Sequence, residues 1–255
     1  MAVRLGFRTF GSGPIRVLAL HDWFCDCTSW DATLPYLTPD RFTYAFADLR
    51  GYGESRRIEG EFTLEEAVAD CIALTEHLGW TRYALVGHSM SSMVVQRMAQ
   101  IADGPISRIV ALTPTGPASM QIDQGTSELF HGIALSDDDS RFTTMSAMWG
   151  ARLSESWIRF KLRRWRETAD PVAAAKYVEM WGCTDISDGA RGIATPMLIA
   201  AGAEDAPPFR AAALETSMLP FYLHAKLISL ENCGHYPMQE VPPLLATTIE
   251  RFLWE

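Results

Sequence analysis

Short runs of apolar residues alternate with longer segments of helical periodicity along most of the chain. β-Branched and aliphatic residues dominate these runs, which span residues 15–21, 43–49, 82–88, 107–113, 196–202 and 225–231. Several runs are almost wholly apolar, as expected for parallel strands that helices cover on both faces. Strands that alternate with helices predict an α/β fold, with a mostly parallel central sheet joined by crossover connections.

One of the connecting segments carries clear helix signals at both ends. Thr63 is followed three residues later by Glu66, which is the sequence signature of a capping box. Apolar positions then recur near helical spacing until Gly79, a residue type that commonly ends helices. We therefore expect a helix between the second and third apolar runs.

Residues 115–192 interrupt this alternation, because they contain helix-forming stretches and no clear apolar strand run. Within them, Ile158, Leu162 and Trp165 fall at i, i+4 and i+7, which predicts an amphipathic helix. We interpret residues 115–192 as a helical insertion and residues 1–114 and 193–255 as the α/β core. Most aromatic residues of the insertion are expected to form its own core. Three of its tryptophans are candidates to line an apolar substrate pocket: Trp149, Trp157 and Trp181.

Composition narrows the classes of partner. The 255 residues include 22 basic and 31 acidic side chains, a formal charge of −9, which argues against broad binding to nucleic acid or anionic lipid. The N-terminal residues alternate between polar and apolar types, so we expect neither a signal peptide nor a membrane span, and a cytoplasmic protein. The sequence leaves the oligomeric state open.

The five cysteines are odd in number and scattered, which is not the pattern of a disulfide framework. Cys25 and Cys27 are separated by one residue, closer than the usual spacing of zinc ligands, and no second pair completes a tetrahedral set. We therefore expect reduced thiols and no metal site.

A candidate nucleophile lies in the stretch VGHSMSSMV, residues 86–94. Ser89 stands where an apolar strand turns into a helix, and such a sharp turn exposes the hydroxyl beside helix-terminal N–H groups. The common pattern G-x-S-x-G is broken by Ser91, but serine is small enough for this position. The strand-turn-helix context makes Ser89 a stronger candidate than the motif alone.

A serine nucleophile needs a base and a third group that orients it. Asp205 follows the strand predicted at 196–202, and His235 follows the strand predicted at 225–231. Residues beyond the carboxyl ends of parallel strands converge on one edge of the sheet, so Ser89, Asp205 and His235 can meet there. Glu204 is an alternative acid at the same loop.

The chain resembles the α/β-hydrolase fold superfamily over essentially its full length. The resemblance is carried by the segments LHDWF, DLRGYGES, GHSMS, GAEDAPP and NCGHYP. It implies that Ser89 is the nucleophile, that His235 is the general base and that Asp205, preferred over Glu204, orients His235. It also implies an oxyanion hole formed by the backbone N–H groups of Trp23 and Met90, a helical cap at the insertion, a small-molecule substrate and no cofactor.

Three further polar residues are expected near the pocket or the oxyanion loop. His21 and His88 flank the expected pocket and are candidates to line it, although such positions are commonly structural in the superfamily. Asp22 replaces the usual glycine of the oxyanion loop, and its carboxylate would repel a developing oxyanion. We therefore expect Asp22 to point away from the hole or to accept a hydrogen bond.

The leading functional hypothesis is hydrolysis of an ester, a lactone or an activated carbon–carbon bond in a small, mainly apolar or aromatic substrate. The same fold also hosts cofactor-independent dioxygenases that open 3-hydroxy-4-quinolone-type rings with histidine as the base. Their catalytic acid follows the strand after the serine-bearing turn, where this chain has Thr113 and Pro114. A third hypothesis is a ligand-binding protein of the same fold with slow or absent turnover.

Overall fold

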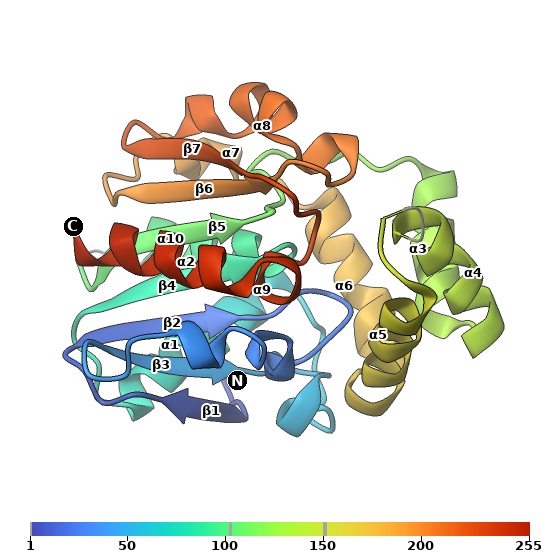
Figure 1. The fold of residues 1–255 in the computed structure, drawn as a ribbon, viewed down its shortest axis with the longest axis horizontal. Coiled ribbons are helices and arrows are strands. Elements are labelled where there is room, and N and C mark those ends of the chain that lie inside the picture. Colours follow the sequence, from blue (N-terminus) through green and yellow to red (C-terminus); the bar gives the residue numbers. More distant parts are fainter. Residues whose placement is uncertain (1, 102–103, 150–151) are drawn as a thin grey trace.

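The computed structural model describes residues 2–101, 104–149 and 152–255. Within these ranges, one twisted sheet of seven strands runs through the molecule in the order β1-β3-β2-β4-β5-β6-β7 (Figure 1). The strands are β1 (Phe7–Phe10), β2 (Ile15–Leu20), β3 (Phe42–Ala47), β4 (Tyr83–His88), β5 (Ile106–Leu112), β6 (Met197–Gly202) and β7 (Ala225–Leu230). The α/β fold class expected from the apolar runs is confirmed.

All neighbouring strands from β3 to β7 pair in parallel, and β1 alone pairs antiparallel, with Phe7 opposite Ala47 on β3. The sequence pattern did not reveal β1. This strand has four residues, and none of them is fully buried, because the strand forms an edge of the sheet. The central strand β4 is buried along its whole length, which accounts for its unbroken apolar run.

Helices cover both faces of the sheet (Figure 1). One face is packed by α1 (Leu64–His77), α2 (Ser91–Ile101) and α8 (Ala211–Ser217), and the other by α10 (Pro242–Trp254), which follows the single turn α9 (Pro237–Glu240). The Thr63 side chain caps α1 by accepting from the Glu66 N–H, and Gly79 adopts φ +66° just beyond the helix. Both signals read from the sequence therefore operate at this helix.

The segment between β5 and β6 is helical. Its helices are α3 (Gln124–Leu135), α4 (Asp138–Trp149), α5 (Glu155–Thr168), α6 (Pro171–Cys183) and the short α7 (Ser187–Ala190). Figure 1 shows α3, α4 and α5 grouped beside the edge of the sheet where the parallel strands end. We call α3 to α6 the cap helices. Ile158, Leu162 and Trp165 of α5 are buried, as the amphipathic pattern predicts.

Candidate active site

The turn between β4 and α2 presents Ser89 at a strained backbone angle, φ 54°. Its N–H donates to the Leu112 carbonyl at 2.9 Å, which ties the turn to the end of β5. Gly87 is required two residues earlier, because a Cβ there would lie 2.5 Å from the Ser91 carbonyl oxygen. The close approach of strand and helix therefore holds the Ser89 hydroxyl above the end of the sheet.

Ser91 lies at the start of α2 and is fully buried. Its hydroxyl donates a hydrogen bond to the backbone carbonyl of His21, in the loop that follows β2. The serine that breaks the common motif thus links the helix after Ser89 to the loop that carries Trp23.

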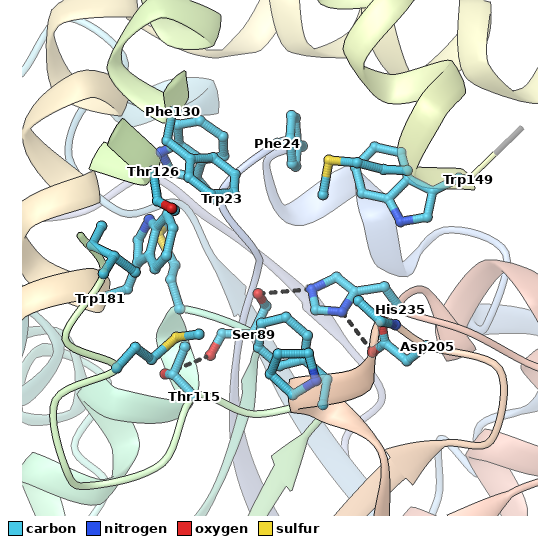
Figure 2. A pocket seen from close by; sticks show the side chains of 17 residues that line it. Trp23, Phe24, Ser89, Thr115, Thr126, Phe130, Trp149, Trp181, Asp205 and His235 are labelled. Carbon is cyan, nitrogen blue, oxygen red and sulfur yellow. Dashed lines mark hydrogen bonds and ion pairs between the residues drawn. The ribbon is translucent and has the colours of Figure 1, made fainter. Parts of the chain in front are cut away.

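The structure brings Ser89, His235 and Asp205 together from three separate loops. His235 Nε2 lies 2.9 Å from Ser89 Oγ, and His235 Nδ1 lies 2.7 Å from Asp205 Oδ2 (Figure 2). Asp205 is buried, and its other oxygen accepts from the Ala206 N–H at 2.7 Å. Glu204 is farther out, where its carboxylate lies 3.6 Å from the Arg152 guanidinium. The side chain that contacts the histidine is therefore Asp205.

The histidine sits in an environment that favours its protonated form. Burial by itself would lower the pKa of His235, but the charge of Asp205 and its hydrogen bond raise the pKa above the ordinary value of 6.5. Asp22 also raises this pKa, whereas Lys161 lowers it. A proton taken up by His235 is therefore stabilised at this site.

Glu240 of α9, which was not among the residues expected from the sequence, holds the loop that carries His235. One of its carboxylate oxygens accepts from the Gly234 N–H at 2.8 Å, and the other accepts from the Tyr236 N–H at 2.9 Å. Arg152 also pairs with this carboxylate. One backbone hydrogen bond on each side of His235 therefore fixes the loop. The sequence signal for this role was a glutamate five residues after the histidine.

Two residues at the site have backbone N–H groups that donate no hydrogen bond within the described ranges. In the described parts of the chain, neither the Trp23 N–H nor the Met90 N–H donates a hydrogen bond. Both residues line the pocket that contains Ser89. The hydroxyl of Tyr52 donates to the Trp23 carbonyl at 2.9 Å and so restrains the peptide that follows Trp23. Free N–H groups beside a serine hydroxyl are donors available to an oxyanion.

Ser89 and His235 open into a cavity of about 320 Å³ between the sheet and the cap helices (Figure 2). Aromatic side chains dominate its lining: Trp23, Phe24, Phe130, Trp149, Trp181 and Phe209. Apart from Ser89, Asp205 and His235, its polar lining residues are Thr115 and Thr126. Because Asp205 is engaged by His235, the cavity offers no free charge to a ligand.

The structure places the five candidate pocket residues differently. Trp149 and Trp181 line the cavity, whereas His21, His88 and Trp157 do not. The His21 ring instead accepts from the Leu49 N–H at 3.0 Å, and His88 Nε2 lies 2.7 Å from the His235 carbonyl oxygen. Trp157 packs edge-on against Trp149, with ring centroids 6.2 Å apart. Each of these three side chains fills a packing or hydrogen-bonding role behind the cavity.

Asp22 is fully buried in the loop that follows β2, and its carboxylate accepts hydrogen bonds, as expected. Oδ2 accepts from the Tyr236 hydroxyl at 2.8 Å and from the Phe24 N–H at 3.2 Å. Burial by itself would raise the pKa of Asp22, but the charge of Lys161 and the hydrogen bond from Tyr236 hold it well below its ordinary value. Asp22 is therefore a buried carboxylate in its ionised form.

His88 does not neutralise this carboxylate, although its Nδ1 lies 3.9 Å from Asp22 Oδ1. Burial lowers the pKa of His88 to about 3, so the ring is neutral at physiological pH. Because Nε2 faces a carbonyl oxygen, the proton resides there. Nδ1 and Asp22 Oδ1 are then two acceptors 3.9 Å apart, and no donor from the described residues reaches either of them. The positive charge that balances Asp22 must come from elsewhere.

Within the described ranges, no group of three or more His, Cys, Asp or Glu side chains is arranged to hold a metal ion. None of the helices in the same part of the chain combines the length and the apolarity needed to cross a bilayer.

A serine on a strained strand-to-helix turn, followed along the chain by an aspartate and then a histidine, is the arrangement of the α/β-hydrolase fold. The chain matches a model described as "Alpha/beta hydrolase family" over residues 17–248, and it belongs to that family of enzymes. This finding confirms the resemblance noted in the sequence.

Individual relatives are distant. A non-heme haloperoxidase from Rhodococcus erythropolis is 26% identical over 216 residues, which cover 78% of this chain and 77% of the relative. A bromoperoxidase structure from Bacillus anthracis has a TM-score of 0.86 at 20% identity, covering 98% of this chain and 95% of the other. A thermophilic esterase from Thermogutta terrifontis has a TM-score of 0.81 at 24% identity, covering 98% and 92%. The solved structures support the fold alone.

Proposed function

We propose that this protein is a serine hydrolase that cleaves an ester or lactone of a small, uncharged, mainly apolar or aromatic substrate. The observation that carries the proposal is the chain of two hydrogen bonds from Ser89 Oγ through His235 to Asp205, at the floor of an apolar cavity. An activated carbon–carbon bond next to a carbonyl would present the same electrophile and belongs to the same reaction class.

Acylation begins when Ser89 Oγ attacks the substrate carbonyl carbon and passes its proton to His235 Nε2, 2.9 Å away. Asp205 keeps Nδ1 protonated and stabilises the imidazolium that forms. The negative charge on the former carbonyl oxygen is stabilised by the N–H groups of Trp23 and Met90. His235 then protonates the leaving group, and an acyl group remains on Ser89.

Deacylation repeats these steps with water as the nucleophile. His235 Nε2 removes a proton from the water as it attacks the acyl carbon, and it returns that proton to Ser89 Oγ when the acid leaves. The same two N–H groups stabilise the second oxyanion. No cofactor is required, because every proton in the cycle passes through His235.

The lining of the cavity supports an uncharged, apolar substrate. Its volume of about 320 Å³ suits a small ligand, and six aromatic rings surround it. A charged group in this cavity would lose its hydration without gaining a partner, since Thr115 and Thr126 are the polar residues of the lining outside the Ser89, His235 and Asp205 set.

The position of the acid favours hydrolysis over ring-opening dioxygenation. The carboxylate bound to His235 comes from the loop after β6, whereas the loop after β5 supplies Thr113. The Thr113 hydroxyl donates to the His235 carbonyl at 3.2 Å and does not contact the imidazole as an acid would. The arrangement thus matches the order Ser, Asp, His of serine hydrolases of this fold.

A fluorophosphonate probe tests the proposal directly. It should label the folded protein at Ser89, as read by peptide mass spectrometry, and the label should disappear in Ser89→Ala. A panel of 4-nitrophenyl esters should show turnover that falls by about 10⁴-fold or more in Ser89→Ala and His235→Ala. A folded wild-type protein that resists the probe and binds esters without turnover would instead be a ligand-binding member of the fold.

A further inference from the structure

Lys161 is a fully buried lysine on the inner face of cap helix α5. Among the described residues, no carboxylate forms an ion pair with it. A lysine is rarely buried unless its charge is used, because the ammonium group loses its hydration. The proposed reaction assigns no role to this buried positive charge.

The Lys161 ammonium group contacts both loops that flank the site. Its Nζ lies 3.1 Å from the sulfur of Cys25, which is two residues after Trp23 on the loop that follows β2. The same Nζ lies 3.7 Å from the centroid of the Tyr236 ring, next in sequence to His235. Cation–π contacts of this kind strengthen when they are shielded from water.

The contact with Tyr236 leads on to Asp22. Tyr236 donates its hydroxyl to the Asp22 carboxylate at 2.8 Å, while its ring lies under Lys161. Asp22 immediately precedes Trp23, whose N–H is a proposed oxyanion donor. A buried anion at this place would oppose the charge that develops on the substrate oxygen, because charges interact strongly in a water-excluded site.

We infer that Lys161 is a positioning residue of the cap whose charge balances Asp22 and holds the Trp23 and Tyr236 loops in register for oxyanion formation at Ser89. The inference rests on the proposed hydrolase function. It assigns to the cap an electrostatic role in the reaction step, in addition to its lining of the substrate cavity. Asp22 and Lys161 then act as a compensating pair, so that removing the lysine alone is worse than removing both charges.

The charges around His235 predict that Lys161 affects the pH dependence of activity, which a purely structural role of Lys161 would leave unchanged. In the described part of the chain, Asp205, His88 and Tyr236 contact His235, and Asp22 and Lys161 influence it through their charges. Lys161 lowers the pKa of His235 and Asp22 raises it. Neutral His235 is the form that accepts a proton, so activity is lost as the pH falls through this pKa. Loss of Lys161 therefore moves the acid limb of the pH profile upward.

The experiment compares Lys161→Met, the double variant Asp22→Asn/Lys161→Met and the control Lys176→Met. Methionine keeps the length of the lysine stem without its charge. Lys176 is also on a cap helix, but it is half exposed and pairs with Glu61 on the surface. The measurements are kcat and KM for a 4-nitrophenyl ester, the pH dependence of kcat/KM, and the rate at which a fluorophosphonate captures Ser89.

Lys161→Met should lower kcat and the capture rate about tenfold, leave KM within about twofold and move the acid limb to higher pH. The double variant should recover kcat to within about threefold of wild type and return the acid limb toward its original position. Lys176→Met should behave as wild type in every measurement.

Wild-type kcat and an unmoved acid limb in folded Lys161→Met would overturn the inference, as would a double variant as slow as the single one. If Lys161→Met does not fold, the double variant decides alone: folded and active within threefold supports the inference, and unfolded or tenfold slower overturns it. Failure of the wild-type protein to react with the fluorophosphonate would remove the proposed function itself. Normal labelling with unchanged variants removes only the role of Lys161.

Discussion

The hydroxyl of Ser91 donates a hydrogen bond to the backbone carbonyl of His21 and so ties the start of α2 to the loop that carries Asp22 and Trp23. Both residues are fully buried. The position where the family motif usually has glycine thus holds a side chain that connects the proposed nucleophile turn to the proposed oxyanion loop.

Ser91→Ala should therefore lower both stability and activity. Removal of the hydroxyl leaves a buried carbonyl without this donor, which costs about 1–3 kcal/mol in the free energy of unfolding. We expect kcat to fall several-fold, because the Trp23 N–H loses part of its support. Urea unfolding and ester turnover measure the two effects.

Ser107→Ala is the matched control, since its hydroxyl donates to the Tyr83 carbonyl at 3.0 Å on the sheet. It should lose stability without losing kcat. Equal losses of kcat in both variants would show that the Ser91 bond has no particular connection to the site.

The contact between Asp205 and His235 predicts the pH dependence of activity. Because the pKa of His235 is raised above 6.5, the neutral base predominates only above that raised pKa, and kcat/KM should rise with an apparent pKa higher than 6.5. Asp205→Asn removes the carboxylate that raises this pKa, so the acid limb should move to lower pH while the rate falls sharply.

Glu204→Gln is the control for this prediction, since Glu204 faces Arg152 and not the imidazole. Its acid limb should coincide with that of the wild type. An acid limb that stays in place in Asp205→Asn would exclude Asp205 as the main partner of the base.

We expect Trp149 to limit the size of substrate that the cavity can accept. Its ring packs edge-on against Phe24, with centroids 5.2 Å apart, and it lines the cavity near His235 (Figure 2). Trp149→Ala should raise the ratio of kcat/KM for an octanoyl ester over an acetyl ester by about tenfold, because one indole leaves room for several methylenes.

Leu129→Ala, at an exposed position of cap helix α3, should leave this ratio unchanged. A ratio that fails to rise in a folded Trp149→Ala protein would place the acyl group elsewhere in the cavity.

Arg50 and Asp70 form a buried, two-point ion pair that ties the loop after β3 to helix α1. Arg50 Nη2 donates to Asp70 Oδ1 at 2.9 Å, and Arg50 Nε donates to the other oxygen. Asp70→Asn should lower the free energy of unfolding by about 3 kcal/mol or more, because it leaves a buried guanidinium without its main counter-charge.

Asp31→Asn provides the comparison in urea unfolding, since Asp31 pairs with Arg8 at the surface. Exposed pairs contribute about 1 kcal/mol or less. Similar losses in the two variants would mean that Arg50 is adequately balanced by its other neighbours.

Much of the fold could be predicted from the sequence. The six apolar runs correspond to β2 to β7 within a residue or two at each end. For the inner strands the reason is that parallel strands covered on both faces are almost continuously apolar. The capping residues of α1 were equally clear. The edge strand β1 was missed, since a short, half-exposed strand produces no such run.

At the candidate site, chain order and sheet topology indicated that Ser89, His235 and an acid of the loop after β6 can meet, and the family resemblance favoured Asp205 over Glu204. The structure brings Ser89, His235 and Asp205 into contact. The pocket residues were harder. His21, His88 and Trp157 turn away from the cavity into hydrogen bonds and packing behind it.

Lys161 shows how far the sequence alone could predict the surroundings of a residue. Its place three residues after Ile158 and four before Trp165 already put it on the buried face of α5, so its burial could have been read from the sequence. Only the tertiary structure decided what it is buried against. Helical periodicity determines which face of an element turns inward, because that depends on local geometry alone. Which charges and rings meet on that face depends on how segments more than a hundred residues apart are packed, as Lys161 and Cys25 are.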